Sequence, residues 1–141
     1  MKLRSSSNAR LLCVLLLFAS GAWAATAAEA TYWQTLDTAG GPPQHAARYP
    51  IANALVVGDA VYLFDVGNGV LRQLDAAGLR VDQLHGVFLT HHHLDHNADL
   101  GVVLLSHWTF GNAVPIPLIG PPGTAVLANG LMTANAPTIP A

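Results

Sequence analysis

Short apolar runs separated by turn residues dominate the first part of the chain and are typical of strands. Three such runs predict strands at residues 32–37, 51–57 and 60–64. The Gly58-Asp59 dipeptide between the last two runs is a common hairpin turn, so those two strands are expected to pair antiparallel. Residues 70–77 instead carry apolar side chains at helical spacing, and Gly78 ends that predicted helix.

Strands and helices alternate in the second part of the chain. The predicted elements are a buried strand at 86–90, a helix from 95 or 97 to about 110, a strand at 115–119, and a helix after 124 that ends near 132. Asp95 or Asn97 would cap the first of these helices. Alternation of strands and helices after an initial hairpin predicts an α/β fold.

The first thirty residues have a different pattern, which is that of a secretory signal. A basic start precedes an apolar run of about ten residues at 11–20, and Ala22-Trp23-Ala24 supplies the small residues of a cleavage site. We expect residues 1–24 to be a signal peptide, with cleavage possibly as late as residue 28. The protein would then be exported, periplasmic or secreted, without stable membrane association. An uncleaved membrane anchor remains an alternative.

Charge and cysteine content limit the chemistry that the mature chain would have. Cleavage would remove three of the six basic residues and none of the eight acidic ones, which changes the net charge from −2 to −5. No basic patch is left to bind a nucleic-acid backbone, so we expect a small-molecule, ester-like substrate and no nucleic acid as partner. The single cysteine, Cys13, lies in the predicted signal, so His and Asp must supply any metal ligands.

Four of the seven histidines lie within residues 91–96, directly after the predicted buried strand. His91 and His93 are two residues apart, so in extended backbone their side chains point the same way and can converge on one cation. Asp95 and His96 follow at the turn into a helix and can serve a second cation. Imidazole and carboxylate are typical zinc ligands, and iron or manganese is possible. A chance histidine run on the surface is the alternative, which the strand-to-helix context disfavours.

The motif His91-x-His93-x-Asp95-His96 resembles the signature of the metallo-β-lactamase fold superfamily. Three further segments, in the expected order, resemble the ribonuclease Z and arylsulfatase-like branch of that superfamily. They are the glycine loop of residues 35–41, the Asp-x-Gly turn and helix of residues 64–74, and the Gly-Pro-Pro-Gly turn of residues 120–124.

This resemblance implies an αββα sandwich with a two-metal site, normally zinc, at one edge. His91 and His93 would hold the first metal, and Asp95 and His96 the second. Asp95 would also be catalytic, because it would steer the bridging water and take its proton. Asp65 would hydrogen-bond near the ligands and set their orientation. A simple strand-ending turn is the alternative role for Asp65.

The resemblance also implies that residues 31–141 are the N-terminal half of such a domain, truncated at the C-terminus. The second half would supply a third histidine, a bridging aspartate and a further histidine. After Asp99 the chain has no Asp, Glu, Lys or Arg, and His107 is its last histidine. Asp99 stands where the family often has glycine, and the roles of Asp99 and His107 stay open.

Two kinds of function are compatible with these observations. The first is a metal-dependent hydrolase in which metal-bound hydroxide attacks an ester-type bond, such as a phosphodiester or sulfate ester. Alternative enzymes are a β-lactamase, a lactonase or a glyoxalase II-like thioesterase. The second kind is a truncated, non-catalytic fragment that binds metal weakly. The oligomeric state is left open by the sequence.

Overall fold

The computed structural model describes residues 30–41, 43, 46–110 and 114–138. The expected signal peptide, with both of its possible cleavage positions, lies outside the described residues. The elements in chain order are β1 (Thr31–Asp37), β2 (Ala52–Val57), β3 (Ala60–Val66), α1 (Val70–Ala76), η1 (Val81–Gln83), β4 (Leu84–Phe88), α2 (Leu94–Asn97), α3 (Leu100–Phe110), β5 (Leu118–Ile119), α4 (Thr124–Ala134) and η2 (Ala136–Thr138).

The five strands form one sheet in their chain order, β1-β2-β3-β4-β5. β1 and β2 pair antiparallel, and so do β2 and β3, which are joined by the predicted hairpin turn with Gly58 at φ 58°. β3 pairs parallel with β4, and β4 with β5, so each of these connections must cross back over the sheet. The α/β prediction is therefore confirmed, with an antiparallel hairpin at one side and parallel strands at the other.

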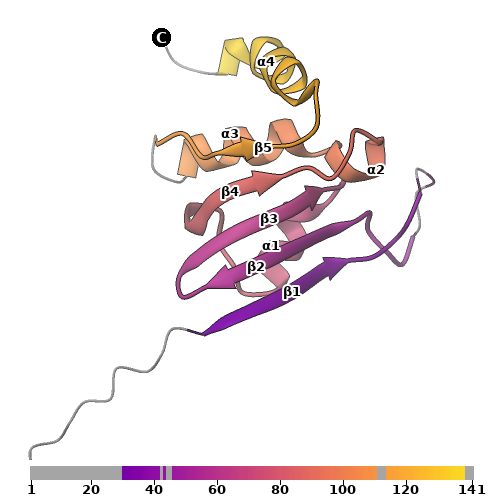
Figure 1. Ribbon diagram of the computed structural model, residues 1–141, viewed down its shortest axis with the longest axis vertical. Helices are drawn as coiled ribbons and strands as arrows, with labels where there is room; N and C mark the ends of the chain where they lie inside the picture. The colour runs from indigo at the N-terminus through magenta and orange to yellow at the C-terminus, as the bar shows by residue number, and fades with distance from the viewer. Residues whose placement is uncertain (1–29, 42, 44–45, 111–113, 139–141) are drawn as a thin grey trace, which may run out of the picture.

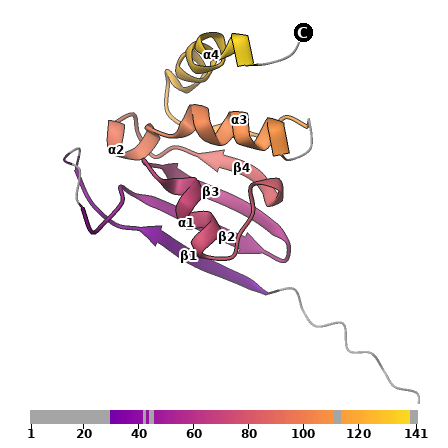
Figure 2. The same ribbon diagram turned by 180° about the vertical axis from the view of Figure 1, so that it is seen from behind.

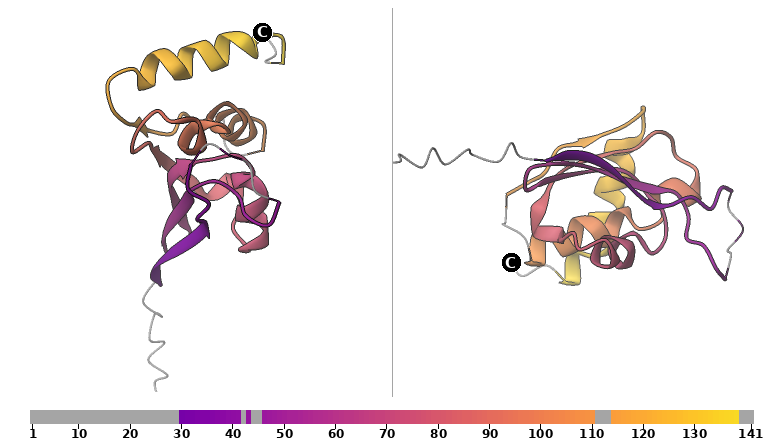
Figure 3. Two further views of the ribbon diagram at one scale, coloured as in Figure 1. Left: turned by 90° about the vertical axis from the view of Figure 1, so that its right-hand side faces the viewer. Right: turned by 90° about the horizontal axis from the view of Figure 1, so that it is seen from below.

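One face of the sheet is covered by α1 and α3 (Figures 1, 2 and 3). Alternate residues of the strands point to these helices, and Ala54 and Leu63 are fully buried there. Val70 and Leu74 of α1 and Val103 of α3 complete this core from the helical side. α4 packs beside α3 and lies at the end of the molecule near β5. The apolar runs of the sequence predicted these strands, whereas the side of the sheet that is buried becomes visible only in the structure.

The opposite face of the sheet has no helical cover among the described residues (Figure 3). A row of aromatic rings crosses it: the Phe64 ring lies 5.0 Å from that of Trp33 and 4.8 Å from that of Phe88, measured between centroids. One sheet with helices on one face only is half of an αββα sandwich, as expected. Three large aromatic side chains stay partly exposed: Trp33, Trp108 and Phe110 are 52%, 37% and 72% exposed.

Element boundaries differ from the predictions where tertiary hydrogen bonds decide them. β4 lies two residues earlier than predicted because its register follows β3. Neither Asp95 nor Asn97 caps a helix, since α2 begins at Leu94 with His93 as its N-cap. A single helix to Phe110 was expected, but α2 ends at Asn97 and α3 begins at Leu100. The break coincides with the Asp99 amide, which donates to the Val66 carbonyl at 3.0 Å.

Four connections meet at the edge of the sheet where β1, β3, β4 and β5 end (Figure 1). They are the loop after β1, the turn after β3, the histidine segment after β4 and the Gly-Pro turn after β5. In α/β sheets this carboxyl edge is the usual place for ligands. The topology therefore brings the motifs noted in the sequence to one edge. Within the described ranges, no helix has the length and apolar character needed to cross a membrane.

Replacing Leu63 by alanine tests the assignment of β3 to the core. Leu63 has no exposed surface, so Leu63→Ala should lower the free energy of unfolding by about 2–5 kcal/mol in urea denaturation. Val126→Ala is the matched control, because Val126 is 77% exposed on α4 and its truncation should cost less than about 0.5 kcal/mol. Equal effects of the two substitutions would contradict the core described above.

Candidate metal centre

Asp65 is the buried anchor of the site. It lies near the end of β3 with only 3% of its surface exposed, and its φ of 61° is the single positive value among described non-glycine residues. Its carboxylate accepts three hydrogen bonds, each 2.8 Å long: Oδ1 from the Thr90 amide, and Oδ2 from the Thr90 hydroxyl and from His96 Nδ1. The predicted orienting role of Asp65 thus agrees with its contacts, which bridge the ends of β3 and β4 to α2.

These hydrogen bonds fix the orientation of two imidazole rings. A carboxylate only accepts, so His96 carries its proton on Nδ1 and keeps the lone pair of Nε2 for another partner. His91 Nδ1 lies 3.0 Å from the Thr90 hydroxyl oxygen, whose proton is directed at Asp65, so His91 Nδ1 is also the donor. Asp65 therefore orients His96 directly and His91 through Thr90.

The three imidazoles lie close together beside Asp95. The His91 ring centroid is 3.9 Å from that of His96 and 4.6 Å from that of His93. His91 Nε2 lies 3.0 Å from His93 Nδ1. Two nitrogens on one tetrahedral zinc, with bonds of about 2.0–2.1 Å, are about 3.3 Å apart. The spacing of these nitrogens is therefore compatible with a shared cation, as the sequence predicted for His91 and His93.

Asp95 is buried, with 6% of its surface exposed, and only one of its oxygens is satisfied. Oδ2 accepts a 2.9 Å hydrogen bond from the Gly41 amide and lies 3.5 Å from His96 Nε2. Oδ1 is buried and has no hydrogen-bond partner among the residues that the structure describes. A buried carboxylate oxygen without a donor is costly, and a cation or a bound water would remove that cost. The donor set therefore fits a divalent metal.

The site is not a closed ligand set within the described part of the chain. No group of three or more His, Cys, Asp or Glu side chains is gathered there in a way that would hold a metal ion. Instead, the nitrogens of His91 and His93 face each other, and His96 faces the two carboxylates. Further ligands, or a rearrangement of these rings around the ion, are needed to complete coordination.

The structure assigns other roles to the remaining polar residues. Asp99 does not join the histidines: its carboxylate accepts from the Gly69 amide at 2.6 Å and from Asn68 Nδ2 at 3.0 Å, which fixes the turn after β3. His92 is exposed, and its Nε2 lies 3.4 Å from the Thr124 hydroxyl at the start of α4. His92 therefore points to the start of α4.

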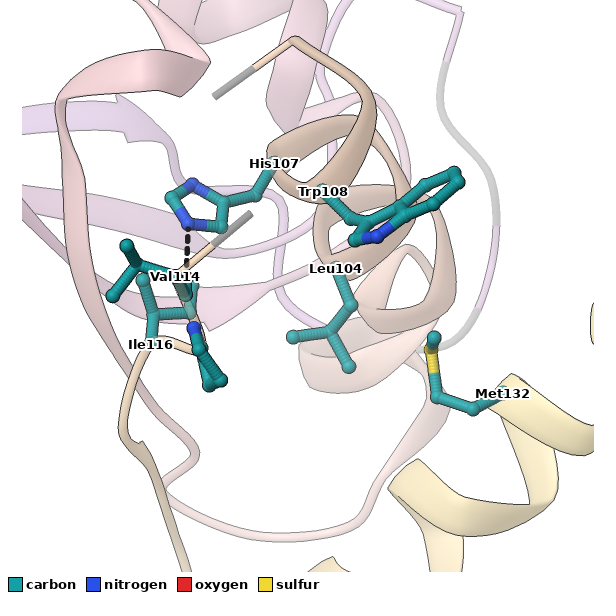
Figure 4. Close-up of a pocket in the computed structure, with 7 residues that line it drawn as sticks. Leu104, His107, Trp108, Val114, Ile116 and Met132 are labelled. Carbon is teal, nitrogen blue, oxygen red and sulfur yellow. Dashed lines mark hydrogen bonds between the residues drawn. The ribbon is translucent and has the colours of Figure 1, made fainter. Parts of the chain in front are cut away.

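His107 is held away from the cluster, in the last turn of α3. Its Nε2 lies 3.1 Å from the Val114 carbonyl oxygen and its Nδ1 lies 3.2 Å from that of Val81 (Figure 4). The ring lines an apolar pocket together with Trp108 and Met132. Its partners come from η1 and from the segment before β5, so His107 has a structural role at the helix end.

Two groups that matter to the site were missed by reasoning from the sequence. Thr90 was assigned only to the end of a strand, although its hydroxyl connects Asp65 to His91. Gly41 was noted only as part of a glycine loop, although its amide binds Asp95, 54 residues later in the chain. Parallel pairing of β3 with β4 explains the position of Thr90, whereas no local pattern predicts the contact made by Gly41.

Comparison with known proteins supports the family resemblance. The family model described as the metallo-beta-lactamase superfamily matches residues 48–129. Ribonuclease Z from Mycobacterium sp. (strain KMS) is 39% identical over 102 residues, which are 71% of this chain and 36% of that protein. Among solved structures, the short form of human tRNase Z has a TM-score of 0.67 and 27% identity, over 74% of this chain and 39% of its own.

A second solved structure gives the same picture. A metallo-beta-lactamase fold protein from Bacillus subtilis has a TM-score of 0.55 and 27% identity, over 62% of this chain and 35% of its own. The chain spans about a third of the length of the ribonuclease Z relatives that it matches. The predicted resemblance to the ribonuclease Z branch, over a partial region of the fold, is thus confirmed.

The expectation of a small-molecule substrate and of no nucleic acid as partner is wrong. The relatives from Mycobacterium and human are named as ribonuclease Z and tRNase Z, and a long-form RNase Z from yeast shares the fold. The net charge led to the wrong prediction because phosphate binding in general depends on local positive charge, to which bound metal ions contribute. The matched region is also only 36% of the length of the ribonuclease Z relative, so the net charge of this chain does not describe a protein of that length.

Replacing Asp65 by asparagine tests whether it orients the metal ligands. Asparagine tolerates positive φ, but its amide group would place a donor against a donor at Thr90 or His96. We expect Asp65→Asn to weaken zinc binding by about 10- to 100-fold in a competition titration of the full-length protein. Asp82→Asn, at a surface ion pair with Arg80, is the control and should leave zinc affinity unchanged. Equal affinities in both variants would argue against the orienting role.

Proposed function

The chain belongs to the metallo-beta-lactamase superfamily, and on that premise we propose that its protein hydrolyses phosphodiester bonds in RNA with divalent metal ions. The observation that carries this proposal is a buried oxygen of Asp95, beside three imidazoles, that no described residue binds. The 39% identity to a ribonuclease Z favours RNA over other esters. A β-lactam, lactone or thioester has no comparable support among the relatives described above.

His91, His93, Asp95 and His96 would hold the metal, with zinc as the first candidate because nitrogen and oxygen ligands suit it. A bound divalent cation supplies Lewis acidity, which activates water and polarises a phosphate oxygen. Asp65 keeps His96 and His91 in the tautomer whose Nε2 lone pair is available. Asp95 Oδ1 is the oxygen free to accept a proton from an attacking water.

The rest of the coordination would come from outside the described residues. The ribonuclease Z from Mycobacterium is nearly three times as long as the matched region. The uncovered aromatic face of the sheet offers a surface on which a second layer of a sandwich could pack. We therefore place the missing ligands in a second half of the domain, and activity is expected of the full-length protein.

Export is a further part of the proposal, and it rests on the layout of residues 1–24. Expression in a Gram-negative host followed by N-terminal sequencing of the periplasmic protein should give Ala25 as the first residue. Replacing Leu15 and Leu16 by Lys should keep the uncleaved protein inside the cell, because two charges break the apolar run. An uncleaved chain found only in the cytoplasm for the natural sequence would contradict export. Export would also decide which RNA the enzyme meets, so we do not restrict the substrate to tRNA.

Replacing His93 by alanine tests the proposed reaction. The full-length protein, supplied with zinc or manganese, should cleave end-labelled RNA transcripts, both with and without a tRNA sequence. His93→Ala should lower kcat/KM at least about 100-fold, because a ligand of the metal is lost. His85→Ala is the matched control: His85 is exposed, and its Nδ1 lies 2.9 Å from the Gln83 carbonyl oxygen, so activity should persist.

Two results would contradict the proposed function. One is a full-length protein that binds zinc and yet leaves all RNA transcripts intact. The other is cleavage that survives in His93→Ala at the level of the His85→Ala control, which would point to a contaminating nuclease or to another site.

A further inference from the structure

Residues 38–41, the start of the loop after β1, reach the candidate metal centre through their backbone. The Gly41 amide donates a 2.9 Å hydrogen bond to Asp95 Oδ2. Gly41 has φ 85°, a left-handed conformation that few other residues adopt at low cost. Because Oδ2 is held by this amide, Oδ1 is the Asp95 oxygen that no other described residue binds. The loop therefore selects which oxygen of Asp95 is available for chemistry.

Asp37, the last residue of β1, closes the base of this loop. Its Oδ1 accepts from the Thr38 amide at 2.6 Å and its Oδ2 accepts from the Tyr49 amide at 2.7 Å. One carboxylate thus binds both ends of a loop of about a dozen residues. A backbone hydrogen bond from the Ala39 amide to the Tyr49 carbonyl, 3.0 Å long, lies directly beside it.

A local irregularity in β1 places the Asp37 side chain at the loop base. The register between β1 and β2 shifts between Thr35 and Asp37, so the regular alternation of side chains is broken there. Such irregularities are a common way to redirect a side chain near a functional site. At this irregular position the Asp37 side chain binds the backbone amides of Thr38 and Tyr49.

The far end of the loop is also anchored. The Tyr49 ring packs so closely on Gly69 that a side chain at Gly69 would collide with it, and the Tyr49 hydroxyl accepts from Arg72 at 3.1 Å. Pro50 is buried and packs on Gly67 in the turn after β3. Because Tyr49 is fixed in this way, the hydrogen bonds of Asp37 connect Thr38 to an anchored residue.

We propose that Asp37 is a positioning residue of the metal centre, which acts through the loop to hold the Gly41 amide against Asp95 Oδ2. This inference rests on the proposed function, since it concerns the geometry of the same ligand. The side-chain hydrogen bonds described for Asp37 go to Thr38 and Tyr49 and not to the histidine segment, so its effect is transmitted by the backbone between Asp37 and Gly41. A purely structural role would affect folding without changing the properties of Asp95.

Asparagine at position 37 is the test, because it keeps the size of the side chain but opposes an amide donor to one of two backbone amides. In the metal-free full-length protein, Asp37→Asn should speed hydrogen exchange of the Gly41 amide at least about 10-fold. Zinc affinity should fall about 10-fold, and kcat on RNA should fall more than KM rises. Asp75→Asn, on the exposed side of α1, is the matched control and should change none of these quantities.

The outcomes separate the two proposals. Unchanged zinc affinity in Asp37→Asn, whatever happens to thermal stability, would overturn the positioning role. A natural protein that binds zinc but cleaves no RNA would refute the proposed function, while the zinc titration of Asp37→Asn would still test this inference. A natural protein that binds neither zinc nor manganese would overturn both. If Asp37→Asn does not fold, Asp37→Ser replaces it, because serine keeps an acceptor for Thr38 but cannot reach Tyr49, and the same loss of zinc affinity is expected.

Discussion

The buried carboxylate of Asp65 is the constraint on which the candidate site depends. Its three hydrogen bonds, to the amide and hydroxyl of Thr90 and to His96, join two parallel strands and the helix that follows them. Such a carboxylate needs all of these donors to be stable in the interior. The same hydrogen bonds therefore stabilise the buried carboxylate of Asp65 and orient the imidazoles. The positive φ of Asp65 costs free energy, which these hydrogen bonds offset.

Asp95 differs from Asp65 in how many of its oxygens accept hydrogen bonds, and this difference indicates different roles for the two aspartates. Every oxygen of Asp65 is satisfied by the protein, whereas Asp95 has one oxygen held by the Gly41 amide and one without a partner in the described part of the chain. A fully bonded group is suited to orient its neighbours, and a half-bonded one to bind an ion or accept a proton. Both are positioned by the edge of the sheet at which four connections meet.

Much of the fold followed from local patterns, while the contacts around the site did not. The Gly58-Asp59 turn between two apolar runs predicted the antiparallel hairpin of β2 and β3. The His-x-His-x-Asp-His spacing predicted which side chains come together. The bond from Gly41 to Asp95 spans 54 residues, and the split between α2 and α3 depends on the tertiary bond of Asp99, so neither has a local signal. Net charge was a poor guide to the partner because a sum over the chain does not say where the charges lie.

The most direct measurement is an anomalous-diffraction map of the full-length protein, crystallised with zinc and collected on both sides of the zinc absorption edge. The account predicts metal density in contact with His91, His93, Asp95 and His96, with Asp65 adjacent to the ligands and not bound to the ion. Zinc density elsewhere in the molecule, or none at this edge of the sheet in a zinc-saturated crystal, would contradict the account.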